Sequence, residues 1–146
     1  MVARNLIGLV FILMFTVPVF SQNKDAVLGK WLNASGEGQI MIYKNGSKYY
    51  GKLIWLKNPE DEKGNAKLDK KNSASSLKSR PLSGLEILKN FEYQGDSTWD
   101  KGTIYDPKTG KTYNCILSMI SSGELDVRGY VGFSMFGKTE TWTRVR

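Results

Sequence analysis

Polar and apolar residues alternate with a period of two along most of the chain from residue 30 onward. β-Branched and aromatic side chains are frequent in these stretches, and Gly, Asn or Asp interrupts them at short intervals. This pattern is typical of half-buried β-strands joined by tight turns, and no sustained helical periodicity competes with it. We therefore predict an all-β protein with eight strands, at residues 30–33, 39–44, 48–56, 87–94, 98–105, 111–119, 125–131 and 138–145.

Most connections between these strands are short and contain residues that favour turns. Asn45-Gly46 is a strong hairpin signal, because both residues tolerate a positive φ. Gly95-Asp96 and the run 106–110 (Asp-Pro-Lys-Thr-Gly) have the same role in later pairs. Eight sequential antiparallel strands predict an up-and-down barrel, since closure removes the exposed sheet edges. A two-sheet sandwich fits the same periodicity and stays open as the alternative.

The connection between the third and fourth predicted strands is much longer than the others. Residues 57–86 are rich in charged residues, Asn and Ser, and their leucines are isolated. Connections of this length are usually functional lids or mobile linkers. We expect one helical turn within residues 73–79, and we expect the leucines of the segment to close over one end of the barrel.

The first 21 residues have the features of an export signal. An uncharged apolar run of about 15 residues follows Arg4, which is shorter than the roughly 20 residues of a membrane-spanning helix. We predict cleavage near Ser21-Gln22, a single barrel domain over residues 22–146, and a periplasmic or secreted location. No second apolar run exists, so we predict no transmembrane segment in residues 22–146.

Composition excludes several kinds of site. The chain has no histidine and one cysteine, Cys115, which excludes a Ser-His-Asp triad, His-ligated metals, Cys-rich zinc sites and an intrachain disulfide. We therefore predict no metal, no cofactor and no catalytic residues. Arg4 is the only basic residue of the first 21, so residues 22–146 keep 20 basic and 14 acidic side chains, a net charge of +6. The lysines are scattered among acidic residues, which is typical of a solvated surface, and export argues against nucleic acid as a partner.

Gly29-Lys30-Trp31 at the first strand and Trp142 with Arg144 on the last resemble the arrangement of the calycin superfamily, which includes the lipocalins. In that arrangement a Gly-x-Trp tryptophan packs beneath a basic residue from the final strand. The resemblance implies that Gly29, Trp31 and Arg144 close the barrel, with the guanidinium stacked on the indole.

Three longer runs are more specific. They are RPLSGLEIL at 80–88, GTIYDPKTGKTY at 102–113, and LDVRGYVG at 125–132, which resumes as GKTETWTR at 137–144. Together they resemble the Domain of Unknown Function 2147 family of exported bacterial proteins, over residues 28–146. The resemblance implies a lipocalin-like barrel in the bacterial envelope and carries no established activity.

The barrel prediction assigns side chains to the interior. The bulkier face of the sixth predicted strand contains Tyr113 and Leu117, and that of the last contains Trp142. Arg128 shares a side with Tyr130 and would enter the interior if the bulkier face points inward. It would then pair with a carboxylate or bind an anionic group of a ligand. If the alternation is reversed, Val127 points inward and Arg128 faces solvent.

Two functional hypotheses remain open. In the first, the barrel binds a small apolar or anionic amphipathic ligand beneath the segment 57–86. Its candidate wall residues are Tyr43, Trp55, Tyr113, Leu117, Arg128 and Trp142. In the second, a filled barrel is a structural or interaction module of the cell envelope. Eight-stranded barrels permit both, because their interiors either are filled by side chains or hold one small ligand. We see no constellation that predicts an enzyme.

Overall fold

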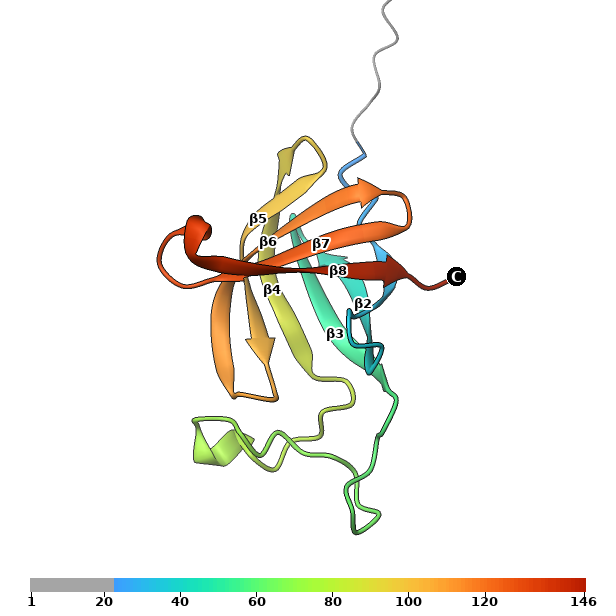
Figure 1. Ribbon diagram of the computed structural model, residues 1–146, viewed down its shortest axis with the longest axis vertical. Coiled ribbons are helices and arrows are strands. Elements are labelled where there is room, and N and C mark those ends of the chain that lie inside the picture. Colours follow the sequence, from blue (N-terminus) through green and yellow to red (C-terminus); the bar gives the residue numbers. More distant parts are fainter. Residues whose placement is uncertain (1–22) are drawn as a thin grey trace, which may run out of the picture.

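The computed structural model describes residues 23–146, and the export signal predicted at 1–21 lies outside this range. Eight antiparallel strands form a closed barrel in which consecutive strands are neighbours and β8 returns to β1 (Figure 1). The strands are β1 (Gly29–Leu32), β2 (Gly38–Asn45), β3 (Lys48–Leu56), β4 (Glu86–Gly95), β5 (Thr98–Asp106), β6 (Lys111–Ser121), β7 (Glu124–Tyr130) and β8 (Gly137–Arg144). Two short 3-10 turns, η1 (Ser75–Leu77) and η2 (Ser134–Phe136), lie in the connections.

The predicted up-and-down barrel is confirmed, and each of the eight predicted strands agrees with an observed strand to within two residues at either end. The ring is closed by the antiparallel pairing of Trp31 with Arg144 and of Leu32 with Thr143. This pairing decides against a sandwich, because no strand of the ring is left with an open edge. Within residues 23–146, no helix has the length and the apolar character that crossing a membrane would need.

The end of the barrel near the N-terminus is closed by the segment 23–28. Trp31 Nε1 donates a hydrogen bond of 2.9 Å to Val27 O, and Trp99 Nε1 donates one of 3.0 Å to Lys24 O. The Tyr49 hydroxyl donates to Asp25 Oδ1 at 2.7 Å. Three buried aromatic side chains therefore donate hydrogen bonds to this segment and hold it across the barrel end.

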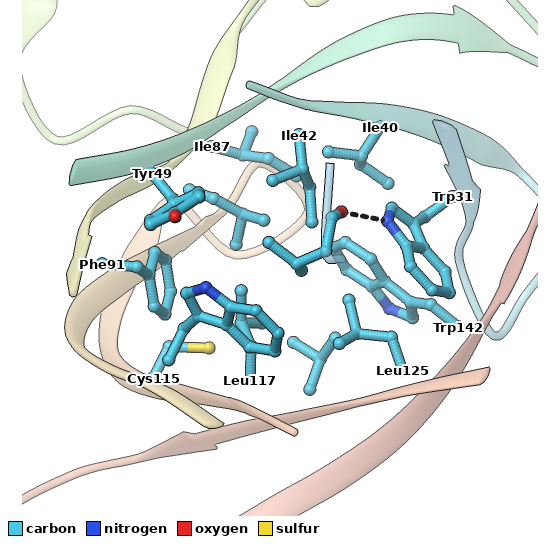
Figure 2. Close-up of a cluster of buried hydrophobic side chains, with 14 of the residues drawn as sticks. Trp31, Ile40, Ile42, Tyr49, Ile87, Phe91, Cys115, Leu117, Leu125 and Trp142 are labelled. Atoms are coloured by element: carbon cyan, nitrogen blue, oxygen red, sulfur yellow. Dashed lines mark hydrogen bonds between the residues drawn. The ribbon is translucent and has the colours of Figure 1, made fainter. Parts of the chain in front are cut away.

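The half of the barrel next to this segment is filled by side chains. Figure 2 shows Trp31, Tyr49, Phe91, Leu117 and Leu125 in one cluster of buried side chains, and all five are at most 1% exposed. Burial of large apolar side chains is the main source of stability in a barrel of this size, which has no disulfide among its described residues. The closed half is therefore an ordinary hydrophobic core.

Two glycines in the strands make this packing possible. A Cβ at Gly102 would lie 2.5 Å from the ring of Phe91, and one at Gly51 would lie 2.8 Å from Leu88 Cδ1. Phe91 and Leu88 are fully buried, and each covers the bare backbone of a neighbouring strand. The missing side chains thus create the space that two core residues fill.

The other end of the barrel is formed by four connections. The β1–β2, β3–β4, β5–β6 and β7–β8 connections all lie there, because the strands alternate in direction (Figure 1). The long β3–β4 segment contains η1 within the predicted 73–79 and extends along this end. Leu85 belongs to the core and Leu82 packs against it, whereas Leu77 is 39% exposed. Only part of the segment's leucines therefore close over the barrel end.

A buried carboxylate anchors the long segment to the barrel. Asp69 is fully buried, and it accepts hydrogen bonds from the Tyr105 hydroxyl at 2.6 Å, Asn72 Nδ2 at 2.9 Å and Arg80 Nε at 2.9 Å. Burial alone raises the pKa of Asp69, but the three hydrogen bonds and the charge of Arg80 outweigh burial and hold the pKa below 3.8. Since Tyr105 belongs to β5, this cluster joins the segment to the barrel wall.

Candidate ligand-binding cavity

A cavity of about 740 Å³ occupies the half of the barrel away from the N-terminal segment. Its deep wall consists of core side chains from different strands: Ile40 of β2, Leu53 of β3, Ile87 of β4, Val127 of β7 and Trp142 of β8. Ile104 of β5 and Tyr113 of β6 complete this wall. A volume of this size falls in the range of small-molecule sites, and the wall is apolar apart from the hydroxyl and indole nitrogen of its aromatic residues.

Trp142 forms the floor of the cavity. Along β8 the cavity is lined by Gly137, Lys138, Glu140 and Trp142, and the next inward residue, Arg144, already lies over Trp31 in the closed end. Trp142 is only 3% exposed, and its Nε1 is buried without a hydrogen-bond partner in the part of the chain that the structure describes. Trp142 therefore lies between the core residues of the closed half and the cavity.

The rim of the cavity is polar and contains charges of both signs. The charged residues there are three lysines and three carboxylates: Lys67, Lys108, Lys138, Glu37, Asp106 and Glu140. A rim of this kind can hold the polar head of a molecule whose apolar part lies against the deep wall. The arrangement thus matches an amphipathic shape, apolar at one end and polar at the other.

One ion pair connects opposite sides of this rim. Lys108 Nζ of the β5–β6 turn lies 2.6 Å from Glu37 Oε2 of the β1–β2 turn. The hydrogen bond and the charge of Lys108 hold the pKa of Glu37 below its usual value, and the same hydrogen bond raises the pKa of Lys108. Because two strands separate these hairpins on either side of the ring, the pair spans the mouth.

Two of the predicted wall residues line the cavity, Tyr113 and Trp142. Leu117 points inward as expected from the alternation of β6, but it lies in the filled half and is fully buried. It therefore belongs to the core beneath the cavity.

Tyr43 and Trp55 lie on the outer surface of the barrel. Tyr43 alternates with the inward Ile42, stacks on Tyr50 at 5.9 Å between ring centroids, and donates a short hydrogen bond to Glu86. Burial and the Glu86 carboxylate raise the pKa of Tyr43 to about 12. Trp55 is 42% exposed, because the register shift between β2 and β3 places it opposite Gln39 rather than on the inward face.

The inward placement of Arg128 is wrong, and the reversed alternation of β7 is observed. Leu125 and Val127 are buried inside the barrel, so Arg128 lies on the outer face. Its Nε donates to Ser134 O at 2.8 Å, and its Nη1 donates to Thr139 Oγ1 at 2.9 Å. Since the inward positions of β7 are its aliphatic residues, hydrophobicity decides the face here rather than side-chain bulk.

Arg144 lies over the Trp31 ring, with its Cζ 4.3 Å from the ring centroid. The guanidinium also donates to Ser122 O at 2.6 Å, Leu28 O at 2.9 Å and Ala26 O at 2.6 Å. A Cβ at Gly29 would lie 3.1 Å from Arg144 Nη1, and Gly29 has a φ of +121°. Gly29 thus leaves room for the guanidinium at the closed end.

Several lining residues were not among the predicted wall residues. Ile40, Leu53, Ile87, Ile104 and Val127 occupy inward positions of their strands at the level of the cavity. Period-two alternation identifies their faces, but it does not tell how far along the barrel axis the core filling ends. Among residues 23–146, no group of three or more Cys, Asp or Glu side chains is arranged to hold a metal ion.

The sequence profile of a family described as "Uncharacterized protein conserved in bacteria (DUF2147)" matches residues 29–144. A solved structure, protein HP1028 from the human pathogen Helicobacter pylori, is described as belonging to the lipocalin family. It is similar to this chain with a TM-score of 0.72 and 24% sequence identity, over 82% of each chain. This likeness shows a shared, lipocalin-like fold. No curated protein matches the sequence.

Proposed function

The chain belongs to the bacterial DUF2147 family, and we propose that it binds a small apolar or amphipathic molecule in the open half of its barrel. The observation that carries the proposal is the cavity of about 740 Å³ bounded by Trp142 and an aliphatic wall. Contact between an apolar chain and this wall removes apolar surface of both from water, which supplies the driving force. The polar head of the ligand stays at the rim.

The affinity of such a cavity for an alkyl ligand depends on the length of the alkyl chain. Each methylene buried against the wall strengthens binding by about threefold to fourfold, until the end of the chain reaches Trp142. A calorimetric titration with alkyl carboxylates of increasing length therefore gives a rise in affinity followed by a plateau. A second series with a trimethylammonium head shows which charge the rim prefers. Absence of measurable binding at every chain length in both series contradicts the proposal.

Two variants, one in the cavity and one on the outer surface of the barrel, test where the ligand binds. Val127→Trp places a large ring next to the floor, so the plateau moves to shorter chains and the affinity of long chains falls about tenfold or more. Ile54→Trp adds the same ring on the outward side of β3 and serves as the matched control, with unchanged affinities. Equal effects of the two substitutions would assign the binding to another part of the surface.

We also propose that the protein acts outside the cytoplasm after removal of residues 1–21. The apolar run that follows Arg4 and the absence of another such run support this location. Expression in a bacterial host, followed by fractionation and intact-mass measurement, gives a product that begins at or near Gln22 in the periplasm or medium. A full-length product that stays in the cytoplasm contradicts this part of the proposal without affecting the cavity.

A further inference from the structure

The β7–β8 loop carries an unusual concentration of exposed apolar side chains. Seven large apolar side chains are exposed within residues 23–146, and four of them lie in the six residues 131–136. They are Val131 at 68%, Phe133 at 70%, Met135 at 74% and Phe136 at 70% exposure. A contiguous group of this kind marks an interaction surface, because leaving it in water is costly.

The fold holds this loop in its exposed form. Arg128 donates to Ser134 O, and Phe136 N donates to Phe133 O at 3.0 Å, which closes the turn η2. A Cβ at Gly137 would lie 2.6 Å from Gly129 O and 3.2 Å from Arg128 Cζ, so the missing side chain makes room for the guanidinium. These contacts therefore hold the loop in a conformation in which its four large apolar side chains are exposed to solvent.

The loop is also part of the cavity mouth. Val131 and Phe136 line the cavity, whereas Phe133 and Met135 do not. The rim itself carries three lysines and three carboxylates, whereas residues 23–146 carry 20 basic against 14 acidic side chains, a net charge of +6. An apolar tip on a chain of net positive charge is complementary to a bilayer that contains anionic lipids.

We propose that residues 131–136 form a membrane-docking tip that inserts Phe133 and Met135 into an anionic phospholipid bilayer and brings the cavity mouth to its surface. This placement rests on the loop geometry, and it gives the proposed cavity direct access to amphipathic molecules of the bilayer. The closed end of the barrel, with the N-terminal segment 23–28, then points away from the lipid.

The test uses the chain that remains after removal of residues 1–21, with a thiol-linked, polarity-sensitive dye at one of two sites. Met135→Cys places the dye on the proposed tip, and Ile120→Cys is the matched control, because Ile120 is 57% exposed at the opposite end of the barrel. Cys115 is fully buried and its pKa is raised to about 12, so it does not compete for the label.

With vesicles of phosphatidylglycerol and phosphatidylcholine, we expect the emission of the dye at position 135 to shift to the blue and that at position 120 to stay unchanged. Phosphatidylcholine vesicles, which have no net charge, or high salt, which screens charge, weaken the shift because both reduce the attraction between the positive chain and the bilayer. Phe133→Ser in the Met135→Cys chain raises the lipid concentration for half of the shift about tenfold, because one large apolar anchor is lost.

Three results would overturn the proposal. The first is no shift at position 135 with phosphatidylglycerol present, and the second is an equal shift at positions 135 and 120. The third is a shift that grows with protein concentration without vesicles, which assigns the tip to contact between two copies of the chain. Because Phe133 lies outside the cavity lining, its substitution leaves the alkyl-carboxylate affinity unchanged, so this test and that of the cavity fail independently.

Discussion

Trp142 separates two chemically different halves of one barrel. It belongs to the buried core cluster and also lines the cavity. Its Nε1 has no hydrogen-bond partner within residues 23–146, which an indole in an interior normally has. Trp142 is therefore one of the residues at which the core meets the cavity.

Cys115 is expected to be chemically inert in the folded protein. Burial raises the pKa of its thiol to about 12, so almost no thiolate exists at neutral pH. The measurement is the rate of alkylation followed by mass spectrometry, with and without denaturant. We predict slow modification of the native chain and rapid modification after unfolding. Rapid modification of the native chain would mean that the inward face of β6 is open to solvent.

Arg144 is expected to stabilise the closed end strongly. Arg144→Met keeps much of the volume but removes three hydrogen bonds to carbonyl groups and the cation–π contact with Trp31. We predict a loss of about 2–4 kcal/mol in the free energy of unfolding. Urea denaturation measures it, with Arg146→Met at the exposed C-terminus as the control. Equal stability of the two variants would contradict the role assigned to Arg144.

Residue placement was predictable from the sequence only where one signal dominated. Tyr113 is inward because bulk and hydrophobicity agree on β6, and Trp142 is inward because it is the one large apolar residue of β8. The inward placement predicted for Arg128 was wrong because side-chain bulk favours one face of β7 and hydrophobicity favours the other. Hydrophobicity decides which face points inward. Trp55 does not line the cavity because an extra residue in β3 shifts the register between β2 and β3. A bulge of this kind cannot be recognised in a period-two pattern of the sequence.

At the scale of elements, the β3–β4 connection is built as an ordered strap. Isolated bridges pair Glu60 with Ala66 and Leu68 with Pro81, and Asp69 ties the strap to β5 through Tyr105. The predicted helical turn and the contribution of Leu82 and Leu85 follow from the sequence. The Asp69 cluster does not, because its partners come from positions up to 36 residues apart.

The charge of Asp69 is expected to matter at neutral pH and to lose its effect in acid. Its folded pKa lies below 3.8, so its contribution is complete above the unfolded value and is lost as the pH falls through the folded value. Asp69→Asn should cost about 2–4 kcal/mol at neutral pH, because Arg80 and Tyr105 lose a charged acceptor.

Urea unfolding at neutral pH and well below pH 3.8 measures this difference. Asp61→Asn is the matched control in the same segment, since the new amide oxygen still accepts from the backbone N–H groups of Lys63 and Asn65. A cost of Asp69→Asn that is the same at both pH values would show that the charge is not what anchors the strap.

The ion pair between Glu37 and Lys108 is expected to control exchange of a ligand more than its affinity. The pair joins two turns across the mouth and is exposed, so its effect on stability is small. Lys108→Gln should raise the association and dissociation rates of an alkyl-carboxylate probe together, by a few fold. Stopped-flow measurement at low and high salt checks this, and high salt should accelerate exchange in the wild type only.

At the scale of the whole molecule, the number, order and bounds of the strands could be predicted from the sequence, whereas the cavity could not. Strand periodicity and turn residues are local signals, and closure follows from eight sequential antiparallel strands. Whether an eight-stranded interior is filled depends on the depth at which each inward side chain lies. That depth is set by register shifts such as those between β3 and β4 and between β5 and β6.

NMR signals of the isoleucine methyl groups within residues 23–146 test most directly where a ligand binds. Ile40, Ile87 and Ile104 line the cavity, Ile42 lies in the filled half, and Ile54, Ile116 and Ile120 lie away from the cavity. With ¹³C-methyl isoleucine labelling, an alkyl-carboxylate titration followed by NMR therefore resolves the cavity, the core and the outer surface in one sample.

We predict chemical-shift changes and intermolecular NOEs to the bound alkyl chain at the methyl groups of the three cavity isoleucines, with the outer isoleucines unchanged. Shift changes confined to Ile54, Ile116 and Ile120, or no change at saturating probe, would contradict the binding function assigned to the open half of this barrel.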